Sequence, residues 1–323
     1  MLSLDFELHW GVRDHKAVDG PYAANLLGAR EAVPAMLRTF ADYDVACTWA
    51  TVGFLFAKGG DELQSWRPAR RPRYADPRLD PYAEPVGHDE ASDPLHFAPS
   101  LIARIAAAPR QEVATHTHSH YYCLEDGGDA EAFAADLAAA RVAAAARGAT
   151  VRSIVYPRNQ RNPAYDDVLR DAGIIAFRGT PAGRVHRARR GSETRLRHRV
   201  LRTADGFSPV GPSYLQRWED VPQASGLCDV AASFFLRPQD PRLRALEPLR
   251  MARLRRAMKE AARDGRLVHL WWHPHNFGVR LSEHLAMLRA LLDTFAECRE
   301  REGMLSLGMA DVAERALSLR ERA

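Results

Sequence analysis

The chain is 323 residues long, with 46% hydrophobic and 27% charged residues, a composition typical of a globular protein with a large apolar core. Its 45 basic and 41 acidic residues leave a net charge of only +4, and no basic stretch carries interleaved aromatic residues, so nucleic-acid binding is not indicated. The sequence lacks closely spaced cysteine pairs, a signal peptide and an apolar run of about 18 residues that would span a membrane, and we therefore expect a cytoplasmic protein.

Short apolar runs alternate with amphipathic segments along the chain. The apolar runs predict strands at residues 2–8, 45–51, 112–115, 152–156, 174–177 and 267–272. The amphipathic segments predict helices at residues 28–43, 99–108, 130–147, 163–172 and 282–302, with a further helix near the C-terminus. This alternation predicts an α/β fold with a parallel sheet, open or closed into a barrel.

Two stretches interrupt the alternation. Residues 58–97 are rich in Pro, Arg and Asp and show little periodicity, and residues 179–223 are also loop-like. The second stretch contains the cluster Arg184–Arg202, with eight arginines and one acid. Loops of this length inside a compact domain are usually functional or disordered. Because we find no internal repeat and no linker, we expect a single domain, 1–323, with these two insertions.

The strongest chemical signal is a histidine-rich segment that follows the predicted strand at 112–115. His116 and His120 are four residues apart, and a turn after the strand would bring both to one side. Neutral imidazoles bind zinc and similar divalent metals. The alternative is a surface loop that is merely rich in histidine.

Asp5 and Glu7 form the second signal. Residues two apart in a strand share a face, so both carboxylates point the same way from an otherwise apolar strand. Buried carboxylates need a metal ion or hydrogen-bond donors to offset the cost of burial. The alternative is an edge strand with a solvated acidic face.

Two further segments place polar residues after predicted strands. His273 directly follows the last apolar run and is a candidate general acid, with His275 and Asn276 just behind it. Arg158 and Asn159 follow the strand predicted at 152–156, where Arg158 could orient a carboxylate or change its pKa. Functional groups at the carboxyl ends of several parallel strands are typical of barrel enzymes.

In this order, the four segments resemble the motifs of the polysaccharide deacetylases, carbohydrate esterase family 4, which share the NodB-homology domain. The first motif, a strand ending in two acids, corresponds to Asp5-Phe-Glu7, with one residue inserted between the acids. The second corresponds to His116-Thr-His-Ser-His120. The third, an arginine near the catalytic aspartate, corresponds to Arg158, although here proline precedes the arginine. The last, a strand followed by histidine, corresponds to His273, and no segment matches the family motif that contains Asp and Trp.

The resemblance implies a distorted (β/α)7-8 TIM-like barrel that removes an N-acetyl group from an amino sugar with the help of one divalent metal ion. Zinc is the expected metal, with cobalt, nickel or manganese as alternatives. The implied metal ligands are Glu7, His116 and His120. Asp5 would act as the general base, Arg158 would assist it, and His273 would protonate the departing amine. A role for Asp5 as a further metal ligand stays open.

The expected substrate is an N-acetylated sugar. The lack of an export signal favours a nucleotide-linked, lipid-linked or other small precursor in surface-polysaccharide or secondary-metabolite biosynthesis. The Arg184–Arg202 cluster is either a phosphate-binding site or a solvated loop. The candidate substrate-binding residues are Trp10, Tyr121, Asn159, Trp272, His275 and Asn276, with Tyr122 and Trp271 as further aromatic candidates.

Three other functions compete with this interpretation. The first is a cyclic-imide or ureide amidohydrolase on the same barrel, which would release no acetate from N-acetyl sugars. The second is a carbohydrate-binding protein with a degenerate site, which metal analysis and an activity assay would identify. The third is a structural metal protein, which the lack of cysteine ligands disfavours. The sequence contains no signal for the oligomeric state.

Overall fold

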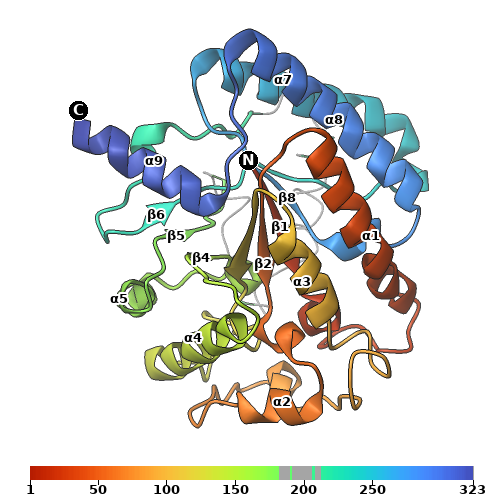
Figure 1. Cartoon of the computed structure of the whole chain (residues 1–323), viewed down its shortest axis with the longest axis vertical. Coiled ribbons are helices and arrows are strands. Elements are labelled where there is room, and N and C mark those ends of the chain that lie inside the picture. Colours follow the sequence, from red (N-terminus) through yellow and green to blue (C-terminus); the bar gives the residue numbers. More distant parts are fainter. Residues whose placement is uncertain (182–189, 191–205, 208–211, 323) are drawn as a thin grey trace.

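The computed structural model describes residues 1–181, 190, 206–207 and 212–322, and its centre is an eight-stranded parallel sheet surrounded by helices (Figure 1). The strand order is β6-β5-β4-β3-β2-β1-β8-β7. The strands are β1 (Leu2–Phe6), β2 (Cys47–Thr51), β3 (Gln111–Thr115), β4 (Ser153–Ile154), β5 (Ala176–Phe177), β6 (Cys228–Asp229), β7 (Phe234–Phe235) and β8 (Leu270–Trp272). The sheet curls into a half-barrel, which confirms the predicted distorted (β/α) barrel.

The helices pack around this sheet. They are α1 (Ala23–Asp42), α2 (Gly60–Ser65), α3 (Pro99–Ala107), α4 (Ala130–Ala145), α5 (Asp166–Asp171), α7 (Glu247–Asp264), α8 (Leu281–Glu302) and α9 (Met309–Arg322). In Figure 1, α1 and α8 lie on the side of β1 and β8, whereas α9 lies beside β5 and β6. Asp129 caps α4, because its Oδ1 accepts a hydrogen bond from the Ala132 amide at 2.7 Å.

One short segment, residues 228–235, connects the two edges of the sheet. It contains both edge strands, β6 and β7, with only four residues between them, so these strands lie within about 17 Å of each other along the chain. The Val230 amide donates to the Phe177 carbonyl at 2.9 Å, on the β5 side. The Ser233 amide donates to the His269 carbonyl at 2.8 Å, on the β8 side. The sheet must therefore curl far enough for both of its edges to reach this segment.

Along β1 and β8, apolar side chains that face the surrounding helices alternate with polar side chains that face the inside of the barrel. Leu4, Phe6 and Trp272 are completely buried in the hydrophobic core beneath the helices. Ser3 and His269 belong to the opposite face, where His269 Nε2 lies 2.8 Å from Ser3 Oγ inside the barrel. Every second residue of a strand shares a face. The polar side chains of the interior face therefore continue up to the carboxyl ends of the strands.

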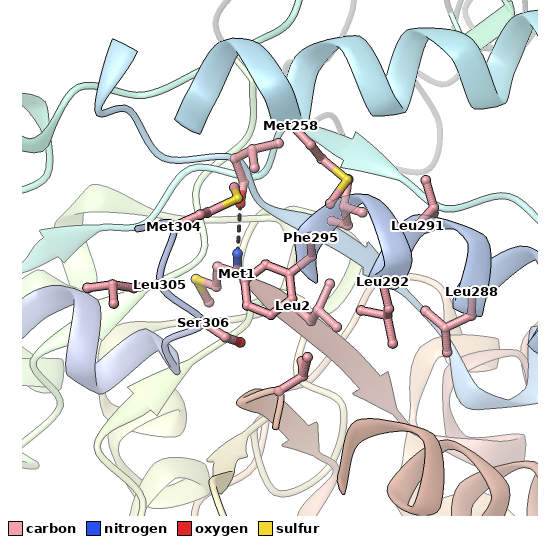
Figure 2. A pocket seen from close by; sticks show the side chains of 13 residues that line it. Met1, Leu2, Met258, Leu288, Leu291, Leu292, Phe295, Met304, Leu305 and Ser306 are labelled. Carbon is pink, nitrogen blue, oxygen red and sulfur yellow. Dashed lines mark hydrogen bonds between the residues drawn. The ribbon is translucent and has the colours of Figure 1, made fainter. Parts of the chain in front are cut away.

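The amino end of β1 adjoins an apolar pocket between α7 and α8, which Figure 2 shows from close by. Residues that line it include Met258, Leu288, Leu292 and Phe295. The Met1 amino group donates to the Val268 carbonyl at 2.9 Å, and burial lowers the pKa of this amine to about 6. None of the side chains that line this pocket is charged, so we assign this end of the barrel to packing and stability.

The predicted elements occur with mostly shorter bounds, and the runs at 152–156 and 174–177 retain only two-residue strands. The periodicity of the sequence does not predict α7, because many arginines interrupt its apolar stripe, which includes Leu254 and Met258. It also does not predict β6 and β7, which are too short to show a period. The Arg184–Arg202 cluster lies outside the described residues apart from Arg190. Among the described residues, no helix combines the length and the apolar character needed to cross a membrane.

Candidate active site

Glu7, His116 and His120 meet just beyond the carboxyl ends of β1 and β3. Glu7 Oε2 lies 3.3 Å from His116 Nε2 and 3.1 Å from His120 Nε2, and all three side chains are buried. Ligands that surround zinc tetrahedrally at 2.0–2.1 Å lie about 3.3 Å from one another. The three atoms therefore have the spacing and chemistry of a site for a divalent transition metal.

The protonation of this group also suits a metal ion. His116 Nδ1 lies 2.8 Å from the Val155 carbonyl, which can only accept a hydrogen bond, so Nδ1 carries a hydrogen and Nε2 is the ring nitrogen that faces Glu7. Burial lowers the pKa of His120 to about 4, so this imidazole is neutral at pH 7. Burial alone would raise the pKa of Glu7, but the neighbouring histidines hold it well below its usual value. The site thus presents two imidazoles, of which His120 is neutral at pH 7, and one carboxylate.

A tight loop brings the two histidines together. Thr117 and His120 both adopt left-handed backbone conformations, with φ of 64° and 58°. The Thr117 hydroxyl accepts a hydrogen bond from the Tyr121 amide at 2.7 Å. Asp136 of α4 accepts hydrogen bonds from the amides of His118 and Ser119, at 2.7 and 3.1 Å. The predicted turn is therefore present, and a buried carboxylate from the next helix fixes it.

Asp5 lies deeper in the barrel and forms a bidentate ion pair with Arg178. Arg178 Nη1 donates to Asp5 Oδ1 at 2.5 Å and Nη2 donates to Oδ2 at 2.7 Å, and both side chains are buried. Arg178 also donates to Ser3 Oγ at 3.1 Å and to Asn159 Oδ1 at 3.2 Å. Burial alone would raise the pKa of Asp5, but the guanidinium, with His116 nearby, lowers it. Asp5 is therefore held as a carboxylate.

The arginine that contacts Asp5 is thus Arg178, and the predicted contact from Arg158 is wrong. Arg158 pairs with Asp14 and lies 4.4 Å from the centre of the Tyr122 ring. Its backbone is left-handed, with φ of 54°, and its side chain is 28% exposed. Arg178 directly follows β5, so the strand-end rule that selected His273 could have selected it too.

His273 faces both carboxylates from the end of β8. Its Nε2 atom lies 3.4 Å from Glu7 Oε1 and 3.9 Å from Asp5 Oδ2. Its Nδ1 atom lies 3.4 Å from Asn276 Oδ1, and its ring stacks on His275 at 4.9 Å between centroids. The His273 side chain is 22% exposed, whereas those of Glu7 and Asp5 are 6% and 5% exposed. His273 therefore lies between the buried acids and solvent.

A cleft of about 220 Å³ adjoins this group, and Asn159, Phe235 and Trp271 contribute to its lining. The Arg178 guanidinium carbon lies over the Trp271 ring, 4.2 Å from the ring centroid. The centroids of the Trp271 and His273 rings are 5.7 Å apart. The cleft is thus next to the Asp5–Arg178 pair.

The aromatic residues that could bind a substrate in the structure differ from those predicted from the sequence. Trp272 is packed in the core against Phe277, so it offers no ring face to a substrate, and Trp271 faces the cleft instead. Trp10 donates its indole N–H to the His96 carbonyl at 2.9 Å, and the Tyr121 hydroxyl donates to the Asp129 carbonyl at 3.0 Å. Both rings are 1% exposed. The assignment of Trp10, Tyr121 and Trp272 to substrate binding is therefore wrong.

No family model and no curated protein matches the sequence, but solved structures match the fold. A Mycobacterium smegmatis protein named as a polysaccharide deacetylase superimposes with a TM-score of 0.60 and 15% identity, over 99% of this chain and 90% of that one. This chain shares its fold.

Two glycan-processing enzymes also match. The 4-alpha-glucanotransferase from Thermococcus litoralis has a TM-score of 0.51 and 12% identity, over 98% of this chain and 40% of that one. The GH57-type branching enzyme from Pyrococcus horikoshii has a TM-score of 0.50 and 13% identity, over 97% of this chain and 69% of that one. Since one fold accommodates several reactions, the reaction must be inferred from the site.

Proposed function

We propose that this chain is a metal-dependent hydrolase that removes the N-acetyl group of an amino sugar. One observation carries the proposal: the Glu7, His116 and His120 ligand atoms converge within bonding range of one ion, with Asp5 and His273 beside them. A set of ligands flanked by an acid and a base is the arrangement that metal-assisted amide hydrolysis needs.

The ligand set of two imidazoles and one carboxylate fits zinc, and three protein ligands leave a position open. When bound, such an ion would lower the pKa of a coordinated water and polarise the amide carbonyl. His116 contributes a fixed tautomer, since its Nδ1–H is bonded to the Val155 carbonyl.

Asp5 accepts the proton of the attacking water in this proposal. Although burial alone would raise the pKa of Asp5, the Arg178 guanidinium lowers it, so at neutral pH Asp5 is in the unprotonated form that a base needs. Because both Asp5 oxygens are bonded to Arg178, the carboxylate cannot rotate away. Arg178 therefore acts as a positioning residue for the base.

His273 delivers a proton to the departing amine. Its Nε2 atom is the ring nitrogen that faces Glu7 and Asp5, so the proton passes through this atom. Asn276 Oδ1 beside Nδ1 holds the ring orientation. Trp271, at the cleft, provides an aromatic face against which a sugar ring can pack.

The test is an acetate-release screen on the zinc-loaded chain with free, nucleotide-linked and lipid-linked N-acetyl amino sugars. We expect stoichiometric acetate and free amine from at least one of them, and loss of both products in the Asp5→Asn variant. Ring opening of cyclic imides or ureides without acetate release would instead identify the amidohydrolase alternative. A metal-loaded chain that binds sugars and hydrolyses none would contradict the proposal.

A further inference from the structure

A second cluster of the same residue types lies outside the proposed active site. His9, Glu84 and His96 bring together two imidazole nitrogens and a carboxylate oxygen. His9 Nδ1 lies 3.0 Å from His96 Nε2 and 3.4 Å from Glu84 Oε1, and His96 Nε2 lies 3.7 Å from the same oxygen. His9 and His96 are 1% and 2% exposed.

The outer nitrogens of both rings are occupied as donors. His9 Nε2 lies 3.0 Å from the Lys16 carbonyl oxygen, which can only accept a hydrogen bond. His96 Nδ1 lies 2.8 Å from an Asp93 carboxylate oxygen, which is also an acceptor. A histidine whose far nitrogen donates to a carbonyl or a carboxylate is the usual arrangement around a protein-bound metal ion.

The two inner nitrogens face each other inside the cluster, with the Glu84 carboxylate as an acceptor beside them. In neutral rings, His9 Nδ1 and His96 Nε2 both lack hydrogen, and their 3.0 Å separation is repulsive unless a cation lies between them. Burial opposes a charge on His96, but the Asp93 and Glu84 carboxylates raise its pKa, so a proton on Nε2 that bonds to His9 Nδ1 is the competing occupant. One metal ion would bind both nitrogens and Glu84 together, and the three separations scatter about the value of about 3.3 Å expected for tetrahedral zinc.

The charge balance favours a cation here. Glu84 and Asp93 supply two carboxylates, whereas Arg13 is the cationic side chain near both His9 and Glu84. Glu84 is the most exposed member, with a side chain that is 20% exposed, so water can complete the coordination on that side.

We propose that His9, Glu84 and His96 form a second, structural site for a zinc-type divalent ion. His9 lies in the 3-10 helix η1 (Leu8–Gly11) directly after Glu7, whereas Glu84 and His96 belong to the insertion 58–97. The ion cross-links this insertion to the end of β1. The proposal does not depend on the proposed reaction, since it concerns metal content and stability.

The experiment counts zinc per chain by plasma mass spectrometry after chelation, reloading and desalting. We expect two for the wild-type chain, one for His96→Asn, one for Glu84→Gln, one for His120→Ala and two for His88→Asn. His88 is the matched control, because it lies in the same insertion and its side chain is 89% exposed. A wild-type count of one that falls to zero in His96→Asn would still support this site and would instead contradict the Glu7 site. Equal counts for wild type and His96→Asn would overturn the proposal.

A second measurement needs no variant. Crystals of the wild-type chain grown with zinc should show an anomalous-scattering peak between His9 Nδ1, His96 Nε2 and Glu84. Absence of this peak in crystals whose Glu7 site is filled would overturn the proposal and would leave a proton shared by the two rings.

Discussion

The Glu7–His116–His120 group and the His9–Glu84–His96 group have the same ligand types but different surroundings. The first adjoins Asp5, Arg178, His273 and a cleft. The second lies between η1 and an insertion, and no cleft described here includes its ligands. The difference teaches that an imidazole–carboxylate set indicates metal binding, and that a neighbouring acid, base and cleft are what indicate catalysis.

The largest expected effect tests this division. His120→Ala removes a ligand of the first group, and we expect acetate release to fall about 10³-fold or more, since metal polarisation is worth several kcal/mol. Glu84→Gln in the second group should change the rate by less than about threefold, since it contacts none of the proposed catalytic residues. Comparable losses in both variants would show that the two groups do not divide their roles in this way.

The Asp5→Asn variant should show whether Asp5 acts as the general base or as a metal ligand. We expect the zinc content to stay unchanged while kcat falls about 10²- to 10⁴-fold, the usual contribution of general acid–base catalysis. Asp14→Asn is the matched control, because Asp14 pairs with the other arginine, Arg158. Zinc analysis and steady-state kinetics on the same samples check this, and loss of zinc in Asp5→Asn would make Asp5 a ligand.

The two arginines should differ in their contribution to stability. Arg178→Met leaves Asp5 buried without its partner, and we expect the free energy of unfolding to fall by about 3–5 kcal/mol. Arg158→Met breaks an ion pair in which Arg158 is 28% exposed, and we expect a loss below about 1 kcal/mol. Urea denaturation followed by circular dichroism measures both. Equal losses would contradict the assignment of Arg178 to the buried pair.

The smallest expected effect concerns pH. His118 lies in the loop between the two histidines of the first group, and burial lowers its pKa to about 3. His96 of the second group instead pairs with the carboxylate of Asp93. Between pH 6.5 and pH 3 the unfolded chain protonates His118 and the folded chain does not, so stability falls as pH falls, by up to about 1.4 kcal/mol per pH unit. Urea denaturation at pH 7, 6 and 5 should show a shallower loss for His118→Phe. An unchanged slope would mean that His118 becomes protonated in the folded chain.

Much of this site could be predicted because its signals are local. The four-residue spacing of His116 and His120, and the two-residue spacing of Asp5 and Glu7, require only a turn and a strand. The order of strands and helices likewise follows from periodicity within short windows. These features do not depend on how the barrel closes.

The missed features depend on contacts between distant parts of the chain. Arg178 lies 173 residues from Asp5, in an arginine-rich protein where one arginine does not stand out. His9 and His96 are 87 residues apart and meet only after the insertion 58–97 folds against β1. Trp271 and Trp272 differ only in the face of β8 that each occupies, and a three-residue strand is too short for the sequence to fix that face.

The closing segment 228–235 has a consequence for how this protein can change. The Ala232 amide donates to the Gly179 carbonyl at 3.0 Å, and the Asp229 amide donates to the Val221 carbonyl at 2.8 Å. The chain between 179 and 221 therefore starts and finishes at anchored points. Between these points Gln216 also bonds to the segment 228–235, because its side chain donates to the Asp229 carbonyl at 2.7 Å and accepts from the Ala231 amide at 2.9 Å. We therefore expect that a change in the length of this stretch leaves both sheet edges connected, provided that Gly179, Gln216 and Val221 keep these hydrogen bonds.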